Sequence, residues 1–147
     1  MHSDKWDIRY LQLAKLVSTW SKDPSTQTGA VITDAKHRLI SVGFNGFPQE
    51  IADDSRLQDR AVKYEMIVHC EINALIFAKQ SLKGCTLYTY PFLSCSRCAS
   101  IMIQAEISRA VAPACPEEAK KRWGANIEFS KSLYEEAGVE VNEMERY

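Results

Sequence analysis

The chain has 147 residues, of which 46% are hydrophobic and 25% are charged, and its formal net charge is −1. This length fits one domain covering residues 1–147, and the apolar fraction is too high for an intrinsically disordered protein. A near-zero net charge argues against a protein that binds nucleic acid mainly through the phosphates, because such binding needs a strongly basic face. It does not exclude a small anionic ligand, which one or two cations can hold.

Neither an export signal nor a membrane-spanning segment is visible. Residues 1–10 are polar and mixed in charge, and no apolar run approaches the roughly 18–20 residues that cross a bilayer. We therefore expect a cytoplasmic protein with no membrane partner (in the host cytoplasm if a virus encodes it). There the five cysteines stay reduced and act as metal ligands, nucleophiles or small buried side chains.

The first half of the chain predicts one helix, a hairpin and a long loop. Apolar residues recur at helical spacing before Trp20, and the Asp23-Pro24 pair disfavours a continuation of that helix. The expected elements are a helix ending near residue 20, a loop over 21–27, strands over 30–33 and 39–44, and a polar loop over 45–63. A loop of the last length inside a compact domain is usually functional or disordered.

The second half predicts strands that alternate with helices. The expected elements are helices over 68–79, 116–123 and 127–137, a loop running into a helix over 94–105, and strands over 86–90, 110–112 and 139–141, with Gly138 as a helix C-cap. This alternation indicates an α/β sandwich, with one mixed sheet and helices on both of its faces. The first two strands form the hairpin, and helical crossovers link the later strands.

The segment Cys95-Ser96-Arg97-Cys98 is a CxxC motif, which by itself fits zinc ligands, a redox pair or two unrelated core thiols. A second feature narrows these readings. His69, at the start of a predicted helix, is followed by Glu71, and this HxE…CxxC spacing is typical of zinc-dependent deaminases of the cytidine type.

The predicted elements favour a catalytic zinc site. His69 lies at one helix N-terminus, Cys95 precedes a second helix, and Cys98 falls in its first turn, so the three side chains can face one point. One nitrogen and two thiolates leave one position of tetrahedral Zn²⁺ open, which is the catalytic pattern, whereas a structural site normally has a fourth protein ligand. Spacing alone does not exclude Cys70, Cys85 or Cys115 as that fourth ligand.

Glu71 is the candidate catalytic residue because a structural zinc site has no use for it. Beside a metal-activated water, its carboxylate can take a proton and pass protons to the ring nitrogen and to the leaving amine. Asn73 shares the helical face of His69, and we expect it to brace a neighbouring loop. Cys70 is expected to be a buried thiol whose backbone N–H, at a helix N-terminus, can bind a ligand carbonyl.

The sequence resembles the deoxycytidylate (dCMP) deaminases, within the larger cytidine deaminase-like group. The resemblance is dense over 21–107 and looser at both ends. It is carried by SKDPSTQTGAVI (21–32), GFNGFP (43–48), KYEMIVHCEINAL (63–75), KGCTLY (83–88) and CSRCASIMIQAEI (95–107). The HxE…CxxC part identifies the broad group, and the SKDPSTQ and GFNG segments point to the nucleotide-monophosphate branch. One departure is Ser94, which stands where this group normally has Pro.

The resemblance implies the three-layer α/β/α sandwich of the cytidine deaminases, with a mixed five-stranded sheet, and hydrolysis of dCMP to dUMP and ammonia. Zinc is then held by His69, Cys95 and Cys98, and Glu71 moves protons. The implied substrate-binding residues are Ser21, Lys22 and Thr26 at the phosphate, Asn45 at the sugar, and Cys70.

The resemblance also implies regulation and assembly. Members of this family are typically hexamers that dCTP activates and that dTTP inhibits together with Mg²⁺. The corresponding regulatory region is 45–60, with Asn45, Gly46, Asp53 and Asp54 as the candidate allosteric residues.

Two other functions remain open at this stage. One is the same chemistry on another cytosine nucleotide or on nucleic acid, against which the charge balance and the SKDPSTQ loop weigh. The other is a noncatalytic, zinc-stabilised module that binds a nucleotide, against which the position of Glu71 weighs.

Overall fold

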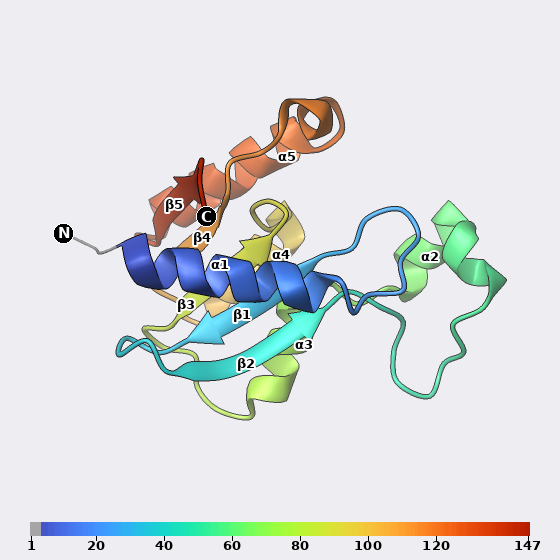
Figure 1. Ribbon diagram of the computed structural model, residues 1–147, viewed down its shortest axis with the longest axis horizontal. Coiled ribbons are helices and arrows are strands. Elements are labelled where there is room, and N and C mark those ends of the chain that lie inside the picture. Colours follow the sequence, from blue (N-terminus) through green and yellow to red (C-terminus); the bar gives the residue numbers. More distant parts are fainter. Residues whose placement is uncertain (1–3) are drawn as a thin grey trace.

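The computed structural model describes residues 4–147 and is built on one mixed sheet of five strands (Figure 1). The strands are β1 (Gly29–Thr33), β2 (Leu39–Phe44), β3 (Thr86–Tyr90), β4 (Arg109–Pro113) and β5 (Glu140–Met144). They lie in the order β2-β1-β3-β4-β5. β1 is antiparallel to β2 and β3, whereas β3, β4 and β5 are parallel. The predicted hairpin and crossover connections are therefore confirmed.

Helices cover both faces of this sheet. They are α1 (Asp4–Ser18), η1 (Ser55–Gln58), α2 (Arg60–Met66), α3 (Cys70–Ala78), α4 (Ser96–Gln104) and α5 (Glu117–Glu136), with η1 a 3-10 turn. α1 packs on one face and α3, α4 and α5 lie on the other, while α2 projects beyond the end of β2 (Figure 1). The three-layer α/β/α class of the cytidine deaminases is confirmed, and the assignment of all residues 1–147 to one domain stays a prediction.

Two glycines let the helices approach the sheet closely. A Cβ at Gly29 would lie 2.2 Å from the carbonyl oxygen of Ala14 in α1, and one at Gly43 would lie 2.4 Å from the carbonyl oxygen of Cys70. Any side chain at these positions would collide with helix backbone, so the absence of a Cβ sets the distance between the layers. Gly43 thereby determines how near the first turn of α3 sits to β2.

Two predicted elements differ in the structure. The segment 45–63 was expected to be a loop, but it contains η1 and the start of α2, because Asp54 and Asp59 cap these helices by accepting hydrogen bonds from Arg56 N and Val62 N. The helices expected over 116–123 and 127–137 form the single helix α5. Gly124 lies inside it, and one internal glycine costs only about 1 kcal/mol, which packing on the sheet offsets.

A buried ion pair ties α1 to the strands. Asp7 is 2% exposed and accepts hydrogen bonds from Tyr88, Arg109 and Asn142, which lie on β3, β4 and β5. Burial by itself raises the pKa of the Asp7 carboxyl, but the hydrogen bonds from Arg109, Tyr88 and Asn142 outweigh it and hold that pKa below its ordinary value. Asp7 is therefore a carboxylate at neutral pH and joins four elements.

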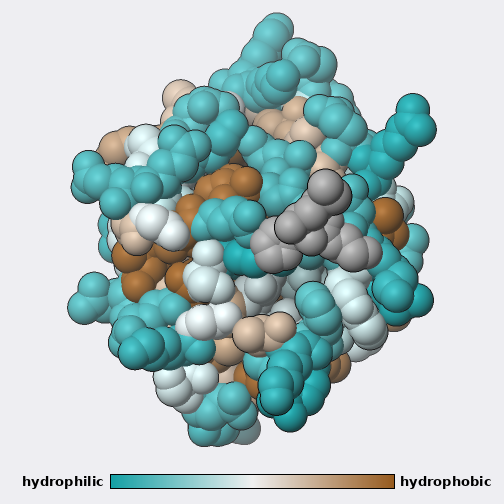
Figure 2. All heavy atoms as spheres, turned by 90° about the vertical axis from the view of Figure 1, so that its left-hand side faces the viewer, coloured by the Kyte–Doolittle hydropathy of each residue, from teal (hydrophilic) through white to brown (hydrophobic). Residues whose placement is uncertain are grey.

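The end of the molecule at which α1 begins is covered mainly by hydrophilic side chains, with small separate hydrophobic patches (Figure 2). No helix among residues 4–147 is both long enough and apolar enough to cross a bilayer.

Candidate active site

Three potential metal ligands converge where α3 and α4 begin. His69 and Cys95 are the N-cap residues of these helices, and Cys98 lies in the first turn of α4, as expected from the sequence. His69 Nδ1 lies 3.2 Å from Cys98 Sγ and 3.5 Å from Cys95 Sγ. In a tetrahedral site with bonds of about 2.0–2.3 Å, ligand atoms lie about 3.3–3.8 Å apart, so these side chains fit one zinc ion.

The thiol chemistry of the cluster also suits a metal. Hydrogen bonding with Cys98 lowers the pKa of the Cys95 thiol to about 4, so this sulfur is the thiolate that binds metals at neutral pH. Within 4–147, no other three His, Cys, Asp or Glu side chains converge in this way. Cys70, Cys85 and Cys115, which spacing alone had left open, are not part of the cluster. One coordination position is thus left without a protein ligand, the catalytic arrangement.

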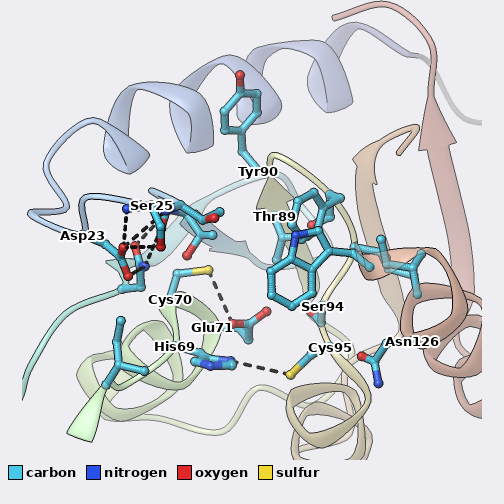
Figure 3. Close-up of a pocket in the computed structure, with 18 of the residues that line it drawn as sticks. Asp23, Ser25, His69, Cys70, Glu71, Thr89, Tyr90, Ser94, Cys95 and Asn126 are labelled. Carbon is cyan, nitrogen blue, oxygen red and sulfur yellow. Dashed lines mark hydrogen bonds between the residues drawn. The ribbon is translucent and has the colours of Figure 1, made fainter. Parts of the chain in front are cut away.

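Glu71 is placed in the first turn of α3, two residues after His69, and is 4% exposed. Figure 3 shows its carboxylate beside the His69–Cys95 pair. Cys70 donates a hydrogen bond from Sγ to Glu71 Oε1 at 3.4 Å. Burial and the neighbouring Glu71 raise the pKa of the Cys70 thiol well above its ordinary value, so this sulfur stays protonated.

These groups open onto a cavity lined by residues from across the chain. The lining residues are Asp23, Ser25, Thr26, Thr28, Asn45, Lys63, Tyr64, Ile67, His69, Cys70, Glu71, Thr89, Tyr90, Phe92, Leu93, Ser94, Cys95, Arg122, Trp123, Asn126 and Ile127. Aromatic and aliphatic walls with a few polar groups are typical of small-molecule sites. The arrangement can hold a flat, partly polar ring next to a metal and an acid–base group (Figure 3).

The family model for the "Cytidine and deoxycytidylate deaminase zinc-binding region" matches residues 4–114. The chain belongs to this family. It is 46% identical over 138 residues to an uncharacterized deaminase of Aliivibrio fischeri, covering 93% of this chain and 92% of that protein. It is 32% identical to the human deoxycytidylate deaminase over 114 residues, which is 73% of this chain and 64% of the human protein. The crystal structure of the dCMP deaminase of cyanophage S-TIM5 with dCMP and dUMP superposes with a TM-score of 0.79 at 20% identity, over 98% of this chain and all of that one, which shows the shared fold.

The deaminase fold brings three of the five predicted substrate residues to the cavity. Thr26, Asn45 and Cys70 line it, whereas Ser21 and Lys22 are not among the lining residues. Ser21 donates a hydrogen bond to the backbone oxygen of Asn45 at 2.9 Å, and so helps to hold this lining residue in place. Lys22 is exposed and lies 3.2 Å from Asp53.

Asn45 holds the loop that follows α1 against the start of β1. Its Oδ1 accepts a hydrogen bond from Thr28 N, and its Nδ2 donates one to Thr26 O, both at 2.9 Å. On α3, Asn73 donates a hydrogen bond to the backbone oxygen of Phe44 at 2.8 Å, which is the bracing contact expected from the sequence. The loop that carries Asn45 is thus held from both of its sides.

Of the four candidate regulatory residues, Asn45 lines the cavity. Gly46, Asp53 and Asp54 are not among its lining residues. Gly46 exchanges backbone hydrogen bonds with Val68, the residue before His69. Asp54 caps η1 and pairs with Arg56 at 2.8 Å. The segment that leads away from Asn45 is therefore physically connected to the segment that leads into the metal cluster.

Sequence reasoning missed several lining residues. Lys63 is buried and forms an ion pair with buried Asp23 at 3.1 Å, and Arg122, Trp123 and Asn126 reach the cavity from α5. Lys63 lay within a segment that carried the resemblance, but nothing in the spacing distinguished it. The three α5 residues lie on a charged helix that reads as a solvated surface, and only the crossover that folds α5 over the sheet brings them to the site.

Proposed function

We propose that this chain is an enzyme that hydrolyses dCMP to dUMP and ammonia. The observation that carries the proposal is a buried carboxylate, Glu71, beside a three-ligand cluster at the wall of a cavity. Membership of the deaminase family, relatives named deoxycytidylate deaminase and the fold shared with a dCMP deaminase support it. A module that only binds nucleotides has no need of Glu71 in this position.

The residues of the chain divide the reaction between them. His69, Cys95 and Cys98 would hold zinc, which when bound would supply a Lewis acid that lowers the pKa of water, so that water loses a proton more easily and becomes a nucleophile for C4 of the cytosine. Glu71 takes one proton from the attacking water and delivers it to N3. It then takes the remaining proton from the new hydroxyl at C4 and delivers it to the amine, which leaves as ammonia when the C4–N bond breaks. The carbonyl of dUMP takes the place of the amine, so one water is consumed for each ammonia released.

Contacts for the rest of the nucleotide come from the loop 21–27 and from Asn45. Thr26 and Asn45 line the cavity where the family resemblance places the sugar–phosphate part of the nucleotide, and the N–H of Cys70, at the start of α3, offers a donor to the base. Ser21 and Lys22 belong to the same loop but do not line the cavity. Ser21 supports the backbone of Asn45 through a hydrogen bond, and Lys22 pairs with Asp53.

A substrate panel tests this function. Ammonia release is measured for dCMP, deoxycytidine, cytosine and single-stranded DNA with the zinc-loaded protein. We expect dCMP to be preferred over single-stranded DNA, because the charge balance of the chain does not suit a polyanion, and over deoxycytidine and cytosine, because relatives of the chain are named deoxycytidylate deaminase. Preferential turnover of DNA or of an unphosphorylated compound would show that dCMP is not the main substrate. No turnover of any of the four would refute the proposal that the chain is a cytosine deaminase of this kind.

We also propose, on the family resemblance, that the enzyme is a cytoplasmic hexamer activated by dCTP and inhibited by dTTP with Mg²⁺. The regulatory site would use Asn45, Gly46, Asp53 and Asp54, whose segment is joined to Val68 beside the metal cluster. Initial rates at low dCMP, with and without each nucleotide and Mg²⁺, test the regulation, and light scattering tests the assembly. Rates that neither nucleotide changes would refute the regulation and leave the deaminase function intact.

A further inference from the structure

The cavity contains two cationic side chains, and only one of them is already neutralised. Lys63 Nζ lies 3.1 Å from Asp23 Oδ1, and both side chains are buried, so the pair contributes no net charge to the cavity. Arg122 is exposed at the edge of the cavity and forms no ion pair with the carboxylates of residues 4–147. Arg122 is therefore the cation that a bound anion would meet.

The Arg122 guanidinium is oriented by two aromatic residues that also line the cavity. Its Nη2 donates a hydrogen bond to the Tyr64 hydroxyl at 3.2 Å, and its Cζ lies 4.6 Å from the centroid of the Trp123 ring. These contacts use one of the five N–H donors of the guanidinium, and stacking on Trp123 uses none. The remaining donors suit two-point binding of a phosphate group, for which arginine is better shaped than lysine.

Three donors of the loop 21–27, which also contributes to the cavity lining, are already occupied. Ser25 N, Ser25 Oγ and Thr26 N all donate to Asp23 Oδ1, at 2.8, 3.0 and 3.2 Å. Lys22, the cation that the family resemblance assigns to the phosphate, lies outside the cavity lining and pairs with Asp53. The loop therefore presents the Asp23 carboxylate, which accepts these three hydrogen bonds from the loop itself. A carboxylate does not compensate the negative charge of a phosphate.

From this charge arrangement we propose that Arg122, on α5, binds the 5′-phosphate of the nucleotide and distinguishes nucleotides from nucleosides. The inference rests on the proposed function, in that it takes the substrate to be a nucleoside monophosphate. The proposal places the base beside Glu71 and the phosphate at Tyr64 and Arg122, which line the same cavity. Arg122 is then a substrate-binding residue supplied by the part of the chain that the family model does not match.

The test compares R122Q, R122K and K22Q with the wild-type enzyme and with K121Q as the matched control. Lys121 is the exposed neighbour of Arg122 and does not line the cavity. We expect R122Q to lower kcat/KM for dCMP about 10- to 100-fold, mainly through KM, because a charge-assisted contact is lost. Turnover of deoxycytidine should change less than about threefold, R122K should retain part of the preference, and K121Q should behave as the wild type.

Calorimetry with dUMP and deoxyuridine measures the same contact without turnover. R122Q should weaken the binding of dUMP and leave that of deoxyuridine unchanged, and thermal unfolding should verify that the variant is folded. Equal loss for both ligands, or a larger effect of K22Q than of R122Q on dCMP, would overturn the assignment to Arg122. A wild-type enzyme without preference for dCMP would instead overturn the proposed substrate, so the two failures can be told apart.

Discussion

Asn126 on α5 holds Ser96, the residue that follows the zinc-ligand candidate Cys95. Its Oδ1 accepts a hydrogen bond from Ser96 N at 2.9 Å, and its Nδ2 donates one to Ser96 Oγ at 3.1 Å. The last helix of the chain thus satisfies one of the free N–H groups at the start of α4 and orients the turn that presents both cysteines.

Replacing Asn126 by alanine should weaken zinc binding about 10- to 100-fold, the usual effect of removing a group that orients a metal ligand. Competition with a chromophoric chelator measures the affinity. E135Q, an exposed position on the same helix, is the control and should leave the affinity unchanged. Wild-type zinc affinity in N126A would contradict this role of Asn126 and would show that the first turn of α4 positions the cysteines without it.

Replacing Glu71 by glutamine should separate metal binding from catalysis. The variant keeps the size and burial of the side chain but loses the proton acceptor, so we expect about one zinc per chain and a rate lowered about 10²- to 10⁴-fold. Metal analysis and ammonia release measure the two quantities on the same preparation. Loss of zinc together with activity would instead indicate that Glu71 supports the metal cluster.

Replacing Gly43 by alanine should disturb the site from the opposite side of α3. The new Cβ would lie 2.4 Å from the Cys70 carbonyl oxygen and 2.5 Å from Ala74 N, so the helix that carries Glu71 has to move. We expect a loss of about 1–3 kcal/mol in the free energy of unfolding and a lower kcat.

Gly124 in α5 is the matched control for this substitution. A Cβ there would approach only the Lys120 side chain, at 3.5 Å, and the position is helical. G124A should therefore raise the stability by about 0.5–1 kcal/mol, because alanine is the better helix former. Urea unfolding of both variants measures the contrast, and equal destabilisation would contradict the close-approach argument for Gly43.

Replacing Asp7 by asparagine should destabilise the fold by about 3–5 kcal/mol at pH 7, because Arg109 then loses its buried carboxylate partner. The pKa of Asp7 is lowered in the folded protein, so its stabilisation is complete above the unfolded value of about 3.9 and is lost as the pH falls through the lower folded value. The difference between wild type and D7N should therefore shrink below about pH 4.

Urea unfolding at pH 7, 5 and 3 follows this difference. Asp4, exposed at the start of α1, is the control, and D4N should cost less than about 1 kcal/mol. A difference between wild type and D7N that is constant down to pH 3 would contradict the depressed pKa of Asp7.

The local parts of the site could be predicted from the sequence. His69 and Glu71, and likewise Cys95 and Cys98, are neighbours in the chain, and the start of a helix dictates how residues at such spacings are presented. Hydrophobic periodicity in the same way placed the five strands and the class of the fold. The continuity of α5 through Gly124 and the helices within 45–63 were missed, because packing and capping outweighed weak local signals there.

The charged and aromatic residues that line the cavity away from the metal cluster could be placed only by the tertiary structure. Lys63 meets Asp23 across 40 positions of sequence, and Arg122 meets Tyr64 across 58. Side-chain type and spacing carry no information about such pairs, because the order of strands in the sheet and the layer on which α5 packs bring them together. The sequence by itself determined the candidate metal ligands and the candidate acid–base group, because their spacing at two helix starts is local, whereas the fold determined which charges line the cavity.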